Sequence, residues 1–210
     1  MRIWLTRKKQ NTTPSTGEPD VTEGWLHPES AQTLLAETTR QQLIQFIRQS
    51  TALPASLFER FWLIPIHRFA ELAQLFPASE NHHHSHAGGL LDHSLEAACY
   101  AARLRQSYLF PPDAAPEDQA AQSERWTTVI IYAALLHDLG KLITDIEVEN
   151  FSGKRWFPWH GPLTQPYRFR YLPQRDYLRH PAAAVLLLTQ LKASTGSPPT
   201  PLHYPPYSTA

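Results

Sequence analysis

The chain has 210 residues, of which 42% are apolar and 18% charged, and its formal net charge is zero. These values exclude a wholly disordered chain and fit one compact domain with short extra segments. The single cysteine, Cys99, excludes an intrachain disulfide framework and a zinc site made of thiolates. No apolar run approaches the ~20 residues of a membrane helix, and no secretory signal opens the chain, so we expect a cytoplasmic protein without a membrane partner.

Apolar spacing and proline positions predict a mostly α-helical domain over residues 25–196. Residues 1–24 are predicted to be a flexible lead-in and residues 197–210 a Pro-rich tail, because neither segment has an apolar face to bury. The predicted helices are 28–50, 54–61, 66–76, 90–108, 126–139 and 181–192, with Pro65 separating the second from the third and Gly140 ending the fifth.

The remaining segments are predicted to be loops and a small β element. Residues 78–89 and the acidic stretch 111–124 lack apolar periodicity, and Ser152-Gly153 is typical of a hairpin turn within residues 146–159. The expected architecture is therefore a helical bundle with a small β-hairpin and loop-rich insertion.

An ionisable pair, His137-Asp138, follows the apolar run 129–136. Such a pair at the end of a buried helix costs several kcal/mol if it is left unpaired. A divalent cation would satisfy both side chains, since imidazole nitrogen and carboxylate oxygen bind Zn, Mn, Fe or Mg. Adjacent helical residues point ~100° apart, so both reach one ion only at the final turn, which Gly140 permits. The alternative is a core histidine beside a surface aspartate, both satisfied by hydrogen bonds.

His93 strengthens the metal hypothesis. It lies on the stripe of Leu90, Ala97, Ala101 and Leu104, so we expect it to face the interior of its helix. A lone histidine there is more often a satisfied core residue. Two helices that each direct a histidine inward, one with a carboxylate beside it, make a metal site in a helical bundle credible.

Five strings of this sequence resemble the HD metal-dependent phosphohydrolase superfamily, and within it the TraI_2 domain of MobH-type conjugative relaxases. The run 82–93 is also similar to HD-type 3′–5′ exoribonucleases. The resemblance covers roughly residues 25–192. The strings are PASE at 77–80, HHHSHAGGLL at 82–91, AALLHDLGK at 133–141, WFPW with GPL within 156–163, and YLRH at 177–180.

The resemblance implies a metal centre. His93 matches the first metal-ligand histidine, and His137 with Asp138 matches the HD pair. His180 matches a later histidine that serves a second metal or a phosphate. The implied cofactor is a divalent metal: Mn, Mg, Fe or Zn.

The resemblance also implies residues that contact a phosphate. Lys141 matches a lysine positioned to meet a phosphate oxygen. His83 and His84 match paired histidines ahead of the glycines 88–89, for which contact with substrate or phosphate is expected. A solvated histidine-rich loop is the alternative for residues 82–86.

One departure from the family pattern concerns the metal shell. HD enzymes carry another aspartate on a later helix, whereas no acidic residue follows Asp176 here. Asp145 lies only a few residues past the His-Asp pair and is a poor substitute. Either the domain is truncated, or another residue substitutes, or the site binds metal weakly.

Residues 154–180 hold six basic residues, seven aromatic residues and one acid. Cations for phosphates and rings for stacking are features of single-stranded nucleic-acid binding, and Arg168 and Arg170 are the predicted contacts. The alternative is a loop-rich subdomain with aromatics in a satellite core and solvated arginines.

Two functional hypotheses follow. The first is a metal-dependent, phosphodiesterase-like HD domain that acts on DNA, expected to be single-stranded, with conjugation-machinery proteins as further partners. The second is a non-catalytic nucleic-acid-binding or assembly module that retains the HD fold. The intact His93, His137, Asp138 and Lys141 favour the first hypothesis, and the missing late aspartate favours the second.

Overall fold

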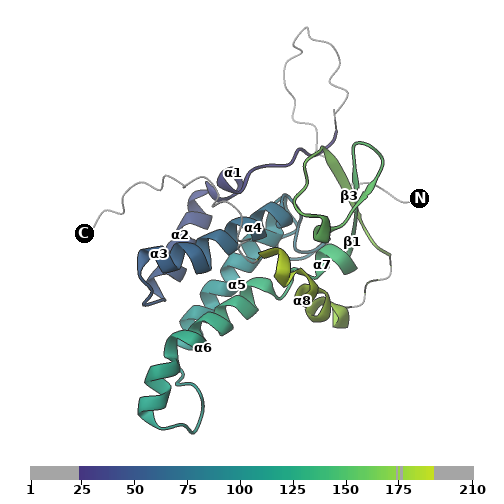
Figure 1. Cartoon of the computed structure of the whole chain (residues 1–210). Helices are drawn as coiled ribbons and strands as arrows, with labels where there is room; N and C mark the ends of the chain where they lie inside the picture. Colours follow the sequence, from purple (N-terminus) through teal and green to yellow (C-terminus); the bar gives the residue numbers. More distant parts are fainter. Residues whose placement is uncertain (1–23, 174, 176, 192–210) are drawn as a thin grey trace.

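A computed structural model describes residues 24–173, 175 and 177–191, which form a mostly helical domain with a small sheet, as predicted (Figure 1). The predicted lead-in and tail lie almost entirely outside these residues. The helices are α1 (Ala31–Leu35), α2 (Thr38–Gln49), α3 (Ala55–Phe58), the π-helix η1 (Glu59–Leu63), α4 (Ile64–Ala73), α5 (Gly89–Arg105), α6 (Pro116–Leu136), α7 (Lys141–Thr144), the 3₁₀ turns η2 (Pro158–His160) and η3 (Tyr177–Arg179), and α8 (His180–Leu191). The strands are β1 (Ile146–Asn150), β2 (Arg155–Trp156) and β3 (Tyr167–Tyr171).

Two helices, α1 and α2, replace the single helix predicted over residues 28–50. The last carbonyls of α1 are taken by side chains of α2. Arg40 donates to the carbonyl of Leu34, and Gln41 donates to that of Leu35 at 2.6 Å. Because side chains satisfy these acceptors, the chain can turn between the two helices without leaving buried carbonyls unpaired.

The prediction that Pro65 separates two helices is wrong, because Pro65 lies inside a continuous helical segment made of α3, η1 and α4. The proline has no N–H for the carbonyl of Phe61, four residues earlier. The hydroxyl of Tyr132, on α6, donates to that carbonyl instead. The π-helix η1 ends at Leu63, two residues before the proline, so the hydrogen-bond pattern of the helical segment changes close to Pro65. A neighbouring helix thus supplies the missing donor.

The helices α5 and α6 pack along each other, and α5 also contacts α2 and α4 (Figure 1). Leu91 and Leu95 of α5 are completely buried. The helix α6 begins at Pro116, within the predicted acidic loop. A proline in the first turn followed by Glu117 and Asp118 suits a helix N-terminus, because these acids interact favourably with the helix dipole.

Among the described residues, the stretch Pro116–Thr144 alone is long and apolar enough, by length and composition, to span a membrane. In its most apolar window, 44% is buried inside the fold. This is weak evidence for a membrane span, since the core helix of a soluble protein passes the same test.

The three strands form an antiparallel sheet in the order β2-β1-β3. The predicted hairpin is β1 and β2, with Gly153 at a φ of +75° in its turn. The third strand, β3, extends this hairpin. Its buried residues Tyr167 and Phe169 pack edge-on against Phe76, with ring centroids 5.4 and 5.2 Å away. These rings attach the sheet to the chain just after α4.

Gly140 does not end the fifth predicted helix. Its φ is −61°, and α6 already ends at Leu136. A Cβ at this position would lie 2.1 Å from the backbone oxygen of His180, the first residue of α8. Glycine is therefore needed because two backbone segments approach closely, and this requirement comes from tertiary packing rather than from the turn itself.

Candidate metal centre

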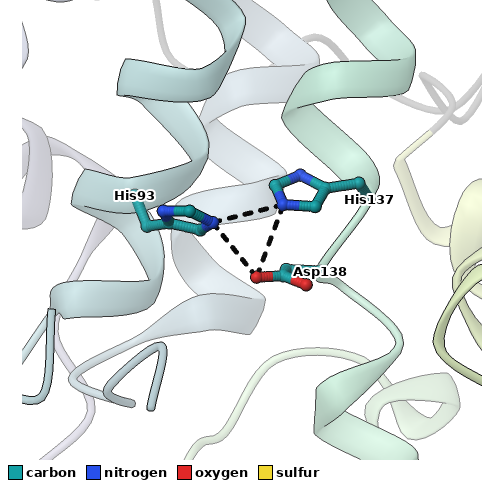
Figure 2. A group of neighbouring side chains, drawn as sticks. All are labelled: His93, His137 and Asp138. Atoms are coloured by element: carbon teal, nitrogen blue, oxygen red, sulfur yellow. Dashed lines mark hydrogen bonds and ion pairs between the residues drawn. The ribbon is translucent and has the colours of Figure 1, made fainter. Parts of the chain in front are cut away.

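Three side chains meet where α5 passes the end of α6 (Figure 2). His93 lies on α5, and His137 and Asp138 directly follow α6. Nε2 of His93 is 3.2 Å from both Nε2 of His137 and Oδ2 of Asp138, and the last two atoms are 3.5 Å apart. Among the described residues, this is the one group of at least three histidine, cysteine or acidic side chains close enough to share a metal ion.

The triangle of donor atoms has the size that a divalent cation requires. Bonds of about 2.1 Å place neighbouring ligand atoms about 3.0 Å apart in an octahedral shell and about 3.4 Å apart in a tetrahedral one. The observed separations, 3.2 to 3.5 Å, match these values. Two imidazoles and a carboxylate therefore fit a cation with three protein ligands, and such a cation keeps coordination positions for solvent or substrate.

His137 is held in the tautomer that metal binding needs. Its Nδ1 lies 2.7 Å from the carbonyl oxygen of Ala134, which is an acceptor, so Nδ1 carries the hydrogen and Nε2 the lone pair. The side chains of His93 and His137 are 33% and 43% exposed, and that of Asp138 is 11% exposed. Asp138 is thus the most buried of the three side chains, and the two imidazoles are partly exposed to solvent.

Asp138 is ionised at neutral pH. Burial raises its pKa, but hydrogen bonds from His93 and Lys141 and the charges of His137 and Lys141 outweigh burial, so its pKa lies well below the usual range. Nζ of Lys141 is 2.6 Å from Oδ2 of Asp138 and 2.9 Å from the carbonyl oxygen of Ala78. A phosphate contact by Lys141, expected from the sequence, would have to compete with these two bonds.

Of the paired histidines, His84 contacts the centre. Its ring centroid lies 5.3 Å from that of His93, and its Nε2 is 3.2 Å from Oε2 of Glu96, one turn further along α5. His84 has a φ of +57°, a conformation that non-glycine residues rarely adopt outside functional sites and turns. His83 is exposed, and its carbonyl accepts a hydrogen bond from Ser79. Glu96 is not among the site residues predicted from the sequence, although its spacing from His93 places both on one helix face.

A partly buried ion pair fixes the start of α5. Arg40 is 7% exposed, and its guanidinium binds both oxygens of Asp92 at 2.6 and 3.1 Å. Asp92 precedes His93 and also faces His86 at 3.3 Å. Gly88 has a φ of +79°, and a Cβ there would lie 2.6 Å from Arg40. Arg40 therefore sets the turn that leads from the histidine-rich loop into α5, and no local motif marks it because it lies on α2.

His180 is not part of the three-residue group. Its Nε2 is 2.7 Å from Oδ1 of Asp145, and both residues are buried. Asp145, whose place in the sequence makes it a poor substitute for the missing metal-ligand aspartate, is thus hydrogen-bonded to His180. Coordination of a second metal by His180 would require this hydrogen bond to break.

Arg168 and Arg170 lie on β3 and pair with two glutamates across the sheet. Arg168 is 3.0 Å from Glu149, and Arg170 is 2.7 Å from Glu147. The register aligns each arginine with its glutamate on β1. The guanidinium of Arg168 also lies 4.8 Å from the ring centroid of Trp25. A DNA phosphate at either arginine would compete with a carboxylate that is already in place.

A family model named TraI_2, with the description "Putative helicase", matches residues 24–194. The match spans most of the chain and includes the three residues of the candidate metal centre. No curated protein matches the chain significantly.

Proposed function

The chain belongs to the TraI_2 family, and from this premise we propose that it is a conjugative DNA-processing domain that acts on phosphodiester bonds through a divalent cation bound by His93, His137 and Asp138. In finer terms, we assign it to the HD superfamily and to the MobH-type relaxases, which its five strings resemble. The observation that carries the proposal is the size of the donor triangle, 3.2 to 3.5 Å on each side, which suits one divalent cation.

A divalent cation at this centre supplies Lewis-acid polarisation of a phosphoryl oxygen and lowers the pKa of a water molecule. The residues of the chain orient the metal ligands and compensate negative charge on the phosphate. The carbonyl of Ala134 faces Nδ1 of His137, so in the neutral ring Nδ1 carries the hydrogen and Nε2 has the lone pair that coordination needs. Lys141 places its ammonium beside Asp138, where it offsets negative charge that develops on a phosphate oxygen. His84, beside His93, is the nearer of the two loop histidines to a bound phosphate, and His83 is a second contact at the exposed side of the loop.

Single-stranded DNA is the proposed substrate. The exposed arrangement of the two metal-binding imidazoles accommodates a long strand rather than a small enclosed ligand. Arg168 and Arg170 are proposed to bind phosphates of the DNA backbone. To do so, they would give up their ion pairs with Glu149 and Glu147. Proteins of the conjugation machinery remain proposed partners, and a cytoplasmic location is part of the same proposal.

A specific observation favours the alternative, a non-catalytic nucleic-acid-binding or assembly module. Within the described residues, the metal group has three members and no further carboxylate. Lys141 is already bonded to Asp138 and Ala78. An HD fold with a weakened metal shell could bind DNA without cleaving it.

Metal content and cleavage separate the two functions. We expect the purified chain to bind about one equivalent of Mn²⁺ or Zn²⁺ by elemental analysis, and to cleave end-labelled single-stranded DNA when metal is added. Asp138→Asn should abolish metal binding and cleavage but leave DNA binding largely intact. The matched control is Asp113→Asn, in an exposed loop at a φ of +62°, which asparagine tolerates. Metal-loaded protein that binds DNA without cleaving it would support the alternative.

A further inference from the structure

The helix α8 begins with a buried histidine that is paired with a buried aspartate. His180 and Asp145 are 6% and 4% exposed, and Nε2 of His180 lies 2.7 Å from Oδ1 of Asp145. The same oxygen accepts a hydrogen bond from the hydroxyl of Thr144 at 2.8 Å. Removing either partner leaves an unsatisfied polar group in the core, which is costly.

The backbone of His180 also contacts the segment that carries two of the proposed metal ligands. A Cβ on Gly140 would lie 2.1 Å from the carbonyl oxygen of His180, so the two backbones are in direct contact. Gly140 and Asp145 flank α7. His180 therefore touches both ends of this four-residue helix, by its backbone at Gly140 and by its side chain at Asp145.

The segment 137–141 has little stability of its own. The turn between α6 and α7 is held by short-range bonds, from the amide of Leu139 to Leu136 at 3.1 Å and from that of Lys141 to Asp138 at 3.0 Å. A single helical turn fixes many dihedral angles for few hydrogen bonds and is not stable alone. Tertiary contacts must therefore hold it, and α8 is in contact with α7.

We propose that His180 and Asp145 are positioning residues of the metal centre. Together they clamp α7 against α8 and keep the segment 137–141 in the conformation that directs His137 and Asp138 toward His93. This inference rests on the proposed function, since it takes those three residues as the cation site. It goes further by giving His180 a role outside the coordination sphere.

The test uses the full chain and Co²⁺, whose visible absorption bands report ligand number and geometry. His180→Ala removes the clamp, whereas His180→Gln retains an N–H donor near the position of Nε2. We expect His180→Ala to weaken Co²⁺ binding by about 10- to 100-fold, the usual effect of losing a residue that orients a metal ligand. His180→Gln should bind Co²⁺ within a few-fold of wild type, and both variants should keep the wild-type band positions.

Hydrogen exchange gives a second readout that needs no metal. The amides of Leu139 and Lys141 should exchange faster in His180→Ala than in the wild type, while those of α2 keep their protection. The matched control is Tyr167→Phe, which removes a buried hydroxyl that accepts a hydrogen bond from the amide of Leu75. This control should lower thermal stability without changing Co²⁺ affinity or exchange at residues 137–141.

The outcomes are separable. Equal loss of Co²⁺ affinity in both His180 variants, with shifted absorption bands, would make His180 a ligand and overturn the inference. Unchanged affinity and exchange in His180→Ala would also overturn it. If the wild type binds no Co²⁺, the proposed function fails. Hydrogen exchange alone then tests whether His180 and Asp145 hold α7 against α8. If His180→Ala does not fold, Asp145→Asn carries the test, with faster exchange at residues 137–141 expected because the charge that binds His180 is lost.

Discussion

Lys141 donates to the same oxygen of Asp138 that faces both histidines of the candidate metal centre. Its Nζ is 2.6 Å from Oδ2, and the Nε2 atoms of His93 and His137 are 3.2 and 3.5 Å from that oxygen. A lysine ammonium and a metal ion would therefore share one carboxylate. Their mutual repulsion in a partly buried site acts against metal binding.

Replacing Lys141 with methionine should consequently retain or increase metal affinity. Methionine keeps the length of the side chain and removes the charge that repels the cation. Titration of Zn²⁺ against a chromophoric chelator would measure the change, and we expect an affinity between that of wild type and about tenfold tighter, a difference of roughly 1.4 kcal/mol. A tenfold loss would instead mean that Lys141 is needed to orient Asp138.

Gly89→Ala should disturb the histidine-rich loop. The new Cβ would lie 2.1 Å from the carbonyl oxygen of His84, which is backbone and cannot rotate away. We expect a loss of about 1–3 kcal/mol in the free energy of unfolding, measured in urea, and displaced ring signals of His84 and His93 in NMR spectra. Gly161→Ala is the control, because a Cβ there meets no atom within 4 Å. Gly161→Ala should lower the free energy of unfolding only by the backbone strain of a φ of +90°, and the ring signals of His84 and His93 should not move.

The two arginines of β3 allow a test of DNA binding. If Arg168 and Arg170 contact phosphates, replacing both with alanine should reduce the slope of log affinity against log salt by ~1.4, because each contact to a single strand contributes ~0.7. Glu147→Gln with Glu149→Gln removes the competing carboxylates and should raise affinity for single-stranded DNA. Fluorescence anisotropy over a salt series measures both effects. If neither double variant changes DNA binding and both lower stability, the ion pairs only stabilise the sheet.

The thiol of Cys99 should be almost unreactive in the folded protein. Burial raises its pKa to about 11, and its Sγ donates to the carbonyl of Leu43 at 3.2 Å. Relative to the reference value of 9.0, the thiolate fraction near neutral pH is about 100-fold smaller, and access is restricted as well. A disulfide reagent should therefore react at the rate of unfolding, and at once in denaturant. Reaction of the native protein within tenfold of the unfolded rate would contradict this burial.

Several features follow from local sequence. The apolar run before His137-Asp138 correctly places that pair at a helix end. The predicted inward stripe of α5 holds only at Leu90, because Leu104 is 62% exposed and the buried face continues through Leu91, Leu95 and Ala98 instead. His93 lies beside that face, with its side chain 33% exposed. Two further local patterns in the sequence mark elements that the predictions above lack. Pro116 followed by Glu117 and Asp118 marks the true start of α6, and the alternation of rings and arginines in YRFRY at 167–171 marks β3.

Other features depend on residues that are distant in sequence. The Arg40–Asp92 pair joins positions 52 apart, and His180 meets Asp145 over a separation of 35. Pro65 is tolerated because the hydroxyl of Tyr132 donates to the carbonyl of Phe61. Gly140 is required because the backbone of His180, at the start of α8, lies against it. Periodicity and ligand chemistry act within one or two helical turns, so the sequence by itself determined which side chains could bind a metal and that His137-Asp138 lies at a helix end. Only the tertiary structure decided that the donor atoms of His93, His137 and Asp138 form one triangle. It also placed His180 in a separate pair with Asp145. Which polar groups are buried depends on which segments pack together, not on neighbours along the chain. A buried polar group costs free energy if it has no hydrogen-bond partner.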